Sequence, residues 1–257
     1  MKLKVLTPSE AEQFVELGYV LVRNVFPESA AAEVRQVIWK KIGLPEDDPA
    51  GWTKPVVHLQ EGIKGGPVEK CFTPRLWDAF DDVMGEGRYN KGMWLGWWPV
   101  AFPGFDKPPW TEPQKGWHVD GQQFHHHVDS ADQGLLPIFI FSQIDPGDGG
   151  TCLEERSHFK TARVLRDSEP GGLDVHELAK RVNALPRGKV IETNGKPGDV
   201  LLMHPFMAHA RSNNTGKRVR FICNPCFSLK EKMNLNRANP DEYSLVERAI
   251  VKALAPA

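Results

Sequence analysis

Apolar and polar residues recur with a helical period in the first part of the chain. Thr7-Pro8-Ser9-Glu10 forms a capping box with proline at the first helical position, and Gly18 is expected to end the short helix that follows. A second helix is predicted from about Pro27 to Ile42, where apolar residues form a stripe. Between these helices, the run Tyr19–Phe26 is rich in β-forming residues and predicts a strand.

The periodic pattern then breaks. Residues 44–70 are rich in proline and glycine, which predicts a long irregular loop and makes this segment a candidate substrate lid. Thr73-Pro74 is expected to cap a third helix that ends at Gly85. Near the end of the chain, Asn239-Pro240-Asp241-Glu242 is expected to cap a terminal helix that reaches about Leu254.

From Gly92 onward the pattern changes to short apolar runs separated by turns. Strands are predicted, with one helix around 174–185 between them, at 93–102, 115–122, 136–144, 189–193, 199–203 and 218–227. Helices on both sides of a β-rich middle favour a mainly β fold: a double-stranded β-helix (jelly roll, cupin-like) core with flanking helices.

We expect one domain over residues 1–257, without an interdomain linker. Its predicted parts are an N-terminal helical support at about 1–90, a jelly-roll core at about 91–228, and a C-terminal helix at about 239–254. A site in the mouth of the barrel is the expected place for chemistry.

Composition limits the classes of function. The chain has 257 residues, 40% of them hydrophobic, with 8 Trp and 13 Phe, which is ample for a sizeable core. A net charge of -1 and a pI near 6.8 give no bulk electrostatic reason to bind nucleic acid or an anionic membrane. No apolar run approaches the roughly 18 residues of a spanning helix, and the N-terminus lacks a signal pattern. We therefore expect a cytoplasmic protein without a nucleic-acid or membrane partner.

The four cysteines do not form a disulfide pattern. With no secretory signal, they are expected to be reduced. Cys223-Asn224-Pro225-Cys226 has the C-x-x-C spacing, but a zinc site needs a second pair of cysteines or suitably spaced histidines. A structural role for these thiols is the favoured interpretation.

The strongest chemical signal is His118-Val119-Asp120, followed downstream by His209 and, eleven positions later, by Arg220. Two imidazoles and one carboxylate can occupy one face of an octahedral metal site, the arrangement associated with non-haem Fe(II) oxygenases. Alternate residues of a strand share a face, so a strand over 115–122 would point His118 and Asp120 the same way.

His204 competes with His209 for the place of the distal ligand. Eleven residues beyond His204 is Thr215, which cannot bind a carboxylate in a bidentate manner, whereas the same offset from His209 reaches Arg220. This favours His209.

Four segments resemble the phytanoyl-CoA dioxygenase family of Fe(II)/2-oxoglutarate-dependent oxygenases. They are Phe14–Phe26, Gly116–Asp120, Gly149–His158, and Gly198–Pro205 with its continuation to His209 and Arg220. The resemblance spans roughly residues 10–228. Glu155-Arg156 stands where the family more usually has Pro-Gly.

The resemblance implies a site and a reaction. His118, Asp120 and His209 would bind Fe(II), and 2-oxoglutarate would be the cosubstrate of an O2-dependent oxidation. Arg220 matches the family's cosubstrate arginine, and arginine suits a carboxylate because its planar fork binds two oxygens. Arg218, two residues away on the same strand face, is the alternative. A carboxylate ligand at Asp120 leaves no place for a halide, which favours hydroxylation over halogenation.

Other candidates are weaker. Gln143 is polar within an apolar strand and is a second candidate for binding cosubstrate. Trp98, Trp117 and His125 are candidates for the substrate pocket. In the run Met93–Pro99, strand alternation would place Trp94, Gly96 and Trp98 on one face and Leu95 and Trp97 on the other. His158 is expected to be structural, hydrogen-bonded within its own turn, and the rest of the run His125-His126-His127 is expected to lie in a solvated or substrate-facing loop.

Two other classes of function stay open at this point. One is a cupin-like metal-dependent isomerase or hydrolase with the same ligands, and the other is a non-catalytic jelly-roll binding protein. Neither requires an arginine at a fixed offset from the distal histidine. The leading hypothesis is a dioxygenase that hydroxylates or otherwise oxidises a small molecule and releases succinate and CO2.

Overall fold

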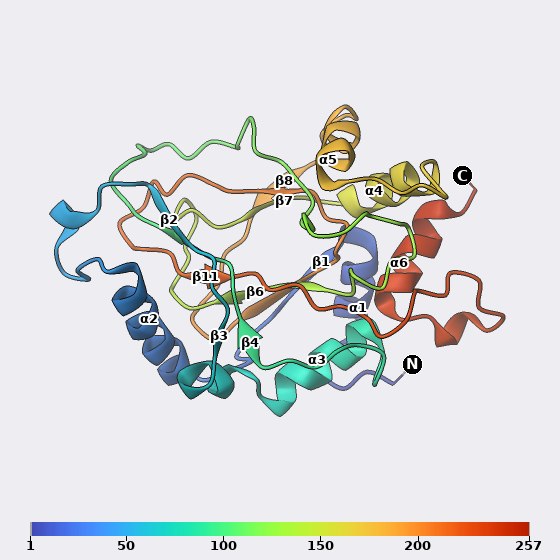
Figure 1. The fold of residues 1–257 in the computed structure, drawn as a ribbon, viewed down its shortest axis with the longest axis horizontal. Helices are drawn as coiled ribbons and strands as arrows, with labels where there is room; N and C mark the ends of the chain where they lie inside the picture. The colour runs from blue at the N-terminus through green and yellow to red at the C-terminus, as the bar shows by residue number, and fades with distance from the viewer. Residues whose placement is uncertain (1, 257) are drawn as a thin grey trace.

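The computed structural model describes residues 2–256 as antiparallel sheets flanked by helices (Figure 1). The helices are α1 (Pro8–Leu17), α2 (Glu28–Ile42), α3 (Pro74–Met84), α4 (Ser157–Arg166), α5 (Val175–Asn183) and α6 (Leu245–Leu254), with short 3-10 helices η1 (Pro49–Gly51), η2 (Gly66–Cys71) and η3 (Pro240–Glu242). The strands are β1 (Tyr19–Val22), β2 (Val56–Leu59), β3 (Ile63–Lys64), β4 (Trp94–Leu95), β5 (Trp98–Ala101), β6 (Leu136–Ile140), β7 (Cys152–Glu154), β8 (Val190–Glu192), β9 (Val200–Met203), β10 (His209–Ala210) and β11 (Ile222–Cys223).

The larger sheet has four strands in the order β1-β9-β6-β11, all antiparallel. An isolated bridge between Ala101 and Arg220 connects β11 to β5, and β5 in turn pairs with β2. Residue 220 therefore lies between β11 and β5, and neighbouring segments of the chain surround it.

The smaller sheet has the order β10-β7-β8. At its β10 edge, His118 and His209 form a bridge in which each backbone N–H donates to the other residue's carbonyl, at 3.0 and 2.9 Å. The remaining pair, β3 and β4, forms a separate two-stranded ribbon.

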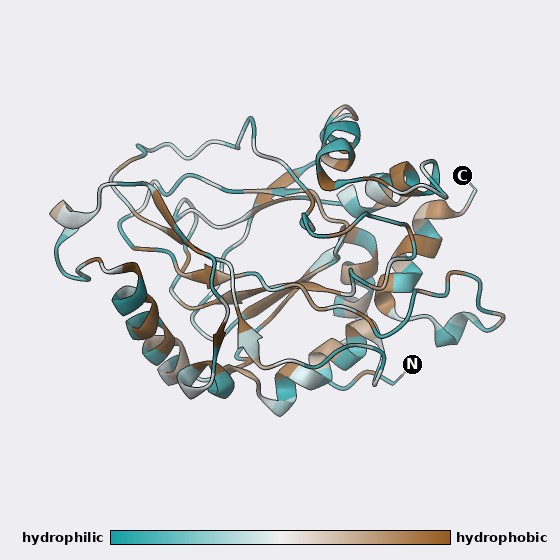
Figure 2. Ribbon diagram, in the orientation of Figure 1, coloured by the Kyte–Doolittle hydropathy of each residue, from teal (hydrophilic) through white to brown (hydrophobic). Residues whose placement is uncertain are grey.

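Every residue of β6 and of β9 is buried, because both faces of the larger sheet are covered. Alternate residues of these strands enter two different apolar clusters. Phe139 and Leu202 pack in the cluster that includes the helices, whereas Ile138 and Leu201 pack with Leu153 of the smaller sheet. Figure 2 shows these strands as apolar ribbons inside helices with hydrophilic outer faces.

Helices α1, α3, α4 and α6 gather at the end of the molecule that holds both chain termini, and α2 lies at the other end (Figure 1). The capping box at Thr7 and the left-handed Gly18 at the end of α1 are confirmed. The predicted cap of the terminal helix is wrong. Asn239 caps η3, and α6 begins at Ser244 with its own capping box to Glu247.

Several predicted elements differ in the structure. Segment 44–70 is not simply an irregular loop, since β2 and β3 lie within it and pair with β5 and β4. The sheets therefore draw strands from before residue 91, earlier than the predicted start of the β core. Helix α4 was not predicted. It begins after Arg156, whose left-handed backbone and lack of a side-chain cap leave no sequence signal.

Predicted strands are generally longer than the observed ones. The run 218–227 contains only β11 as a regular strand, with bridges at Arg220 and Phe227. The predicted strand at 115–122 is wrong, because only His118 forms a bridge there. Within residues 2–256, no helix has the length and apolar character needed to cross a membrane.

Candidate metal centre

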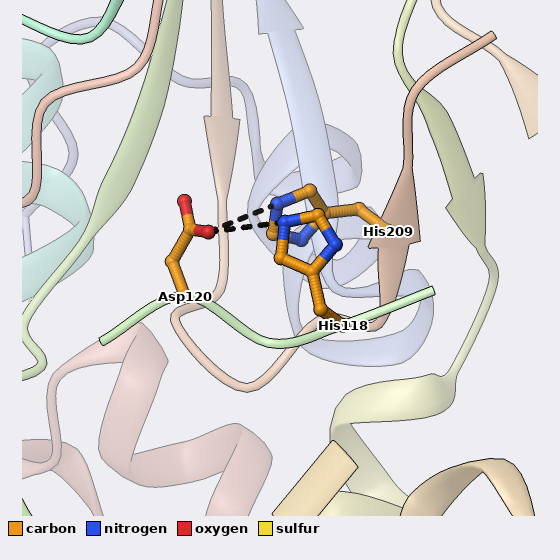
Figure 3. A group of neighbouring side chains, drawn as sticks. All are labelled: His118, Asp120 and His209. Atoms are coloured by element: carbon orange, nitrogen blue, oxygen red, sulfur yellow. Dashed lines mark ion pairs between the residues drawn. The ribbon is translucent and has the colours of Figure 1, made fainter. Parts of the chain in front are cut away.

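His118, Asp120 and His209 lie together, as predicted. One donor atom from each lies within 4.8 Å of the others. Figure 3 shows the Asp120 carboxylate facing both imidazoles. Its Oδ1 is 3.2 Å from Nε2 of His118 and 3.6 Å from Nε2 of His209. Two nitrogens and one oxygen facing a common point form a donor set that suits a first-row transition metal.

The backbone orients both imidazoles in the same way. Nδ1 of His118 is 2.8 Å from the Gly116 carbonyl, and Nδ1 of His209 is 3.0 Å from the Met207 carbonyl. A carbonyl oxygen only accepts, so each Nδ1 carries a proton, and each Nε2 is the nitrogen directed at Asp120 and available to a metal ion. Such a bond to the second nitrogen is typical of metal-binding histidines.

Side-chain hydrogen bonds hold the ligand segment in place of a strand ladder. Asn183 of α5 donates to the Trp117 carbonyl at 2.9 Å, and His126 bonds to the Gly121 carbonyl at 2.9 Å. These contacts stand on either side of His118 and Asp120. The two ligands therefore lie close together although the predicted strand is absent.

Asn224 is a part of the site that the sequence did not reveal. Its Nδ2 donates to Oδ2 of Asp120 at 3.0 Å, so the oxygen that does not face the histidines is also fixed. Asn224 follows β11, on the larger sheet, and thus connects that sheet to the ligand segment. Its only sequence signal is its position four residues after Arg220, on the same strand face.

Electrostatics of the site favour a bound cation. Burial acts to raise the pKa of Asp120, but the adjacent His209 and His118 outweigh it and hold the pKa well below its usual range. Burial acts to lower the pKa of His118, and hydrogen bonding to Asp120 reverses this, so the pKa is raised. Asp120 is therefore an ionised carboxylate, and a metal ion would replace the protons that neutralise it.

The site opens to solvent on one side. The His209 side chain is 6% exposed, whereas those of His118 and Asp120 are 45% and 30% exposed. A pocket of about 560 Å³ adjoins His118 and Asp120. Its lining consists of His58, Leu59, Trp97, Trp98, Pro99, His118, Asp120, Gly121, Gln122, Gln123, Leu136, Asn224 and Cys226.

Arg220 is 2% exposed. Its guanidinium donates one hydrogen bond, to the Pro99 carbonyl at 3.1 Å, and its Nε has no partner among the described residues. Burial, and then the nearby Arg211, lower its pKa to about 10, so it stays charged at neutral pH. Buried charges are normally paired or bound to a ligand. A buried cation without an ion pair in the described chain therefore indicates a place for an anion.

Arg218 and Gln143, the other two candidates for binding the cosubstrate, contact the turn at 145–148 instead. Arg218 forms ion pairs with Asp148, at 2.6 Å, and with Asp145. Gln143 donates to Asp145 at 2.7 Å. Both side chains are thus bound by the turn at 145–148. The shared strand face suggested Arg218, but the acidic turn beside it binds its guanidinium.

Of the three predicted pocket residues, the structure places Trp98 in the lining. Trp117 is buried outside it, with its indole N–H donating to the Pro113 carbonyl and Arg187 4.3 Å above its ring. His125 is exposed and also lies outside the lining. Trp117 thus stabilises the ligand segment rather than forming the pocket wall.

Three other histidines are held within the fold. His204 is fully buried against Phe14 and Phe206 and accepts the Phe206 N–H at 3.1 Å, so it does not face the metal centre. His158 bonds to the Val15 carbonyl of α1 at 3.0 Å, not within its own turn as expected. His126 is buried rather than solvated, which corrects the interpretation of the triple-histidine run as an open loop.

Solved structures share this fold. HygX from Streptomyces hygroscopicus, with nickel and 2-oxoglutarate bound, is 14% identical with a TM-score of 0.54, covering 88% of each chain. EctD from S. alaskensis, with 2-oxoglutarate and 5-hydroxyectoine, is 17% identical with a TM-score of 0.55, covering 89% of this chain and 78% of its own. EvdO2 from Micromonospora carbonacea var. aurantiaca, complexed with 2-oxoglutarate, is 14% identical with a TM-score of 0.53, covering 93% and 97%.

No protein-family model and no curated protein sequence matches the chain. The solved structures confirm the expectation that the chain has the fold of 2-oxoglutarate-binding proteins. Fold does not determine the reaction, which has to be argued from the site.

Proposed function

We propose that this chain is an Fe(II)- and 2-oxoglutarate-dependent oxygenase that oxidises a small molecule, by hydroxylation in the simplest case. The observation that carries the proposal is Arg220, a buried guanidinium without an ion pair in the described chain, on the segment that also contacts Asp120 through Asn224. A metal-dependent isomerase or hydrolase would need the three ligands but has no use for such an arginine.

In this proposal His118, Asp120 and His209 hold the ferrous ion through the atoms that already face one another. Iron and 2-oxoglutarate, when bound, supply oxidising power from O2, with release of succinate and CO2. Asn224 keeps the Asp120 carboxylate oriented, and the backbone carbonyls of Gly116 and Met207 keep both Nε2 atoms available to a metal ion. A carboxylate ligand at this position favours hydroxylation over halogenation.

Arg220 would bind the distal carboxylate of 2-oxoglutarate. Arg220 and Asn224 lie on the same face of one extended segment, about 13 Å apart along the chain. Ile222 lies between them and packs in the apolar cluster shared by the two sheets. This apolar surrounding excludes water and would strengthen the ion pair between Arg220 and the distal carboxylate of 2-oxoglutarate.

We further infer that the two sheets form the jelly-roll core predicted from the sequence. The bridge at Arg220 adds β5 and β2 to the larger sheet, and the bridge at His118 adds the ligand segment to the smaller one. The apolar cluster with Ile138, Leu153 and Leu201 then fills the space between the sheets. The metal ligands lie at the edge of this space, at the mouth of the proposed barrel.

A small-molecule substrate is supported by the size and position of the pocket of about 560 Å³ next to His118 and Asp120. HygX is also described with hygromycin B bound and EctD with 5-hydroxyectoine, so proteins of this fold bind small organic ligands.

The test compares two arginines that are two residues apart. Arg220→Ala should raise the Kd for 2-oxoglutarate at least about thirtyfold, because truncating one partner of a buried charge pair costs about 2–5 kcal/mol. Arg218→Ala should change it by less than about threefold, since its half-exposed guanidinium is already paired with Asp145 and Asp148. Isothermal titration of the anaerobic Fe(II) protein measures both. Equal effects, with both variants folded by circular dichroism, would refute the role of Arg220.

A further inference from the structure

Trp97 is an aromatic residue in a backbone conformation that aromatic residues rarely adopt. Its φ is 61°, in the left-handed region. Bulky side chains at positive φ are outliers, and they persist where the surrounding structure imposes them, often at functional sites. Trp97 is also 48% exposed, while Leu95 and Trp98 are almost fully buried.

The positive φ changes the direction of the side chain. Regular alternation predicts that Trp97 shares a face with Leu95, but Leu95 is 0% exposed and Trp97 lines the open pocket. The prediction from strand alternation is therefore wrong at this residue. The strand is interrupted between β4 and β5, and the indole turns from the core to the site.

The end of β11 and the residue that follows it hold the backbone at Gly96 and at Trp97. The thiol of Cys223 donates to the Gly96 carbonyl at 2.8 Å, and the Asn224 N–H donates to the Trp97 carbonyl at 3.4 Å. Gly96 fits tightly, since a Cβ there would lie 3.0 Å from the Trp94 ring. The segment that positions Asp120 through Asn224 thus also positions the indole.

The rest of the pocket indicates which ligands the indole meets. Within residues 2–256, no lysine or arginine lines it. Its polar groups are the amides of Gln122, Gln123 and Asn224, the imidazole of His58, and the metal-site residues. Burial, followed by Arg211 and Arg220, lowers the pKa of His58, so this imidazole is neutral at pH 7. Asp120 is the anionic group of the lining, and among the described residues no cationic side chain lines the pocket to pair with a phosphate or carboxylate of the substrate.

We propose that Trp97 is the platform on which the substrate stacks, and that the substrate is a ring compound with a flat apolar face and without phosphate or carboxylate groups. This rests on the proposed oxygenase function, since the pocket adjoins the metal centre. The indole face meets the ring, and the amides of Gln122 and Gln123 bind polar groups at its edge. Both a carbohydrate ring and an aromatic ring have this chemistry.

Matched pairs of probes test the charge requirement. Glucose is compared with glucose 6-phosphate, and phenol with 4-hydroxybenzoate, as ligands of the anaerobic protein loaded with Fe(II) and 2-oxoglutarate. Binding is measured by isothermal titration up to millimolar concentrations. We expect a neutral ring to bind more tightly than its anionic partner, and the pair that responds distinguishes sugar from aromatic substrates. Tighter binding of the anionic partners, or no binding of either neutral ring, overturns the proposal.

Three variants test the indole. Trp97→Ala should weaken binding of the neutral ring by roughly tenfold, and Trp97→Phe by less, because stacking contributes about one order of magnitude in affinity. The control is Phe105→Ala, which removes another exposed aromatic side chain that does not line the pocket. Unchanged affinity in Trp97→Ala, or an equal loss in Phe105→Ala, overturns the proposal.

Trp97→Gly separates binding from stability. Glycine adopts positive φ freely, so this variant should keep or raise the Tm while losing the ring ligand. A marked fall in Tm would show that the indole serves the fold, against the proposal. The visible band formed by Fe(II) and 2-oxoglutarate should be unchanged in all Trp97 variants. Absence of that band in the wild-type protein would instead count against the oxygenase function itself.

Discussion

The two halves of the candidate metal centre are built differently. His209 and Arg220 are 5% and 2% exposed; His209 lies in β10, and Arg220 forms a backbone bridge to Ala101. His118 and Asp120 are far more exposed and belong to a segment that, beyond the backbone bridge of His118 to His209, single side-chain hydrogen bonds hold. The buried half can supply fixed positions for cosubstrate and metal, and the open half can admit substrate. The open half should therefore be more sensitive to the loss of one supporting hydrogen bond.

The largest effect is expected from removing the shared carboxylate. Asp120→Ala leaves the two imidazoles without the group that faces both. Fe(II) affinity and iron-dependent succinate release should fall by more than about a hundredfold, beyond the usual effect of a supporting residue. Anaerobic metal titration and a succinate assay measure this. Asp129→Ala, which alters an acidic residue outside the site, is the control and should leave both unchanged.

A smaller loss is expected at the contact between Asn224 and the ligand segment. Asn224→Ala removes the hydrogen bond to Oδ2 of Asp120 and should lower Fe(II) affinity by about 10–100-fold. Asn213→Ala, at an exposed asparagine nearby in sequence, should have no such effect. Wild-type metal affinity in Asn224→Ala would show that the exposed half does not depend on this hydrogen bond.

The buried half should respond to pH instead. His158 and His204 lie behind the segment that leads to His209, and burial lowers the pKa of His158 from 6.5 to about 4. Burial, and then His158, also lower the pKa of His204. Unfolded histidine has a pKa of about 6.5 and binds a proton that the folded form excludes. Stability should thus be full above pH 6.5 and fall toward pH 4, by up to about 1.4 kcal/mol per pH unit for each group.

Urea unfolding at a series of pH values measures this dependence. His158→Phe should flatten it, because the variant removes one excluded proton, while His176→Asn at an exposed position should not. A free energy of unfolding that is constant between pH 6.5 and 4 would contradict the account of the buried half.

The smallest effect is expected at the outer support of the ligand segment. Asn183→Ala removes the hydrogen bond to the Trp117 carbonyl, worth about 1 kcal/mol, and should weaken Fe(II) binding a few-fold. Asn234→Ala is a suitable control on a distant loop. An effect as large as that of Asn224→Ala would mean that the position of the whole segment, rather than of Asp120 alone, limits metal binding.

The sequence predicted local features best. The capping box of Thr7 and the turn at Gly18 depend on residues within a few positions, and both appear as expected. Of the two candidate distal histidines, the structure brings His209 beside His118 and Asp120 and buries His204 elsewhere.

Long-range contacts were not predictable from one sequence. Asn224 meets Asp120 across 104 positions, and Arg218 is bound by Asp145 and Asp148 some 70 positions away. The segment 115–122 has a strand-like pattern, yet side chains of Asn183 and His126 replace the ladder. At Trp97 the local rule of alternation failed, as expected at positions where function competes with regular structure.

In the proposed function, the three ligands and Arg220 together bind a ferrous ion and 2-oxoglutarate. Anaerobic titration of the Fe(II) protein with 2-oxoglutarate, followed by visible absorbance, tests it most directly. We predict a weak absorption band that saturates at one 2-oxoglutarate per chain and is absent from Asp120→Ala. A wild-type protein that binds iron but gives no band, or that is active with zinc and indifferent to 2-oxoglutarate, would contradict the claim.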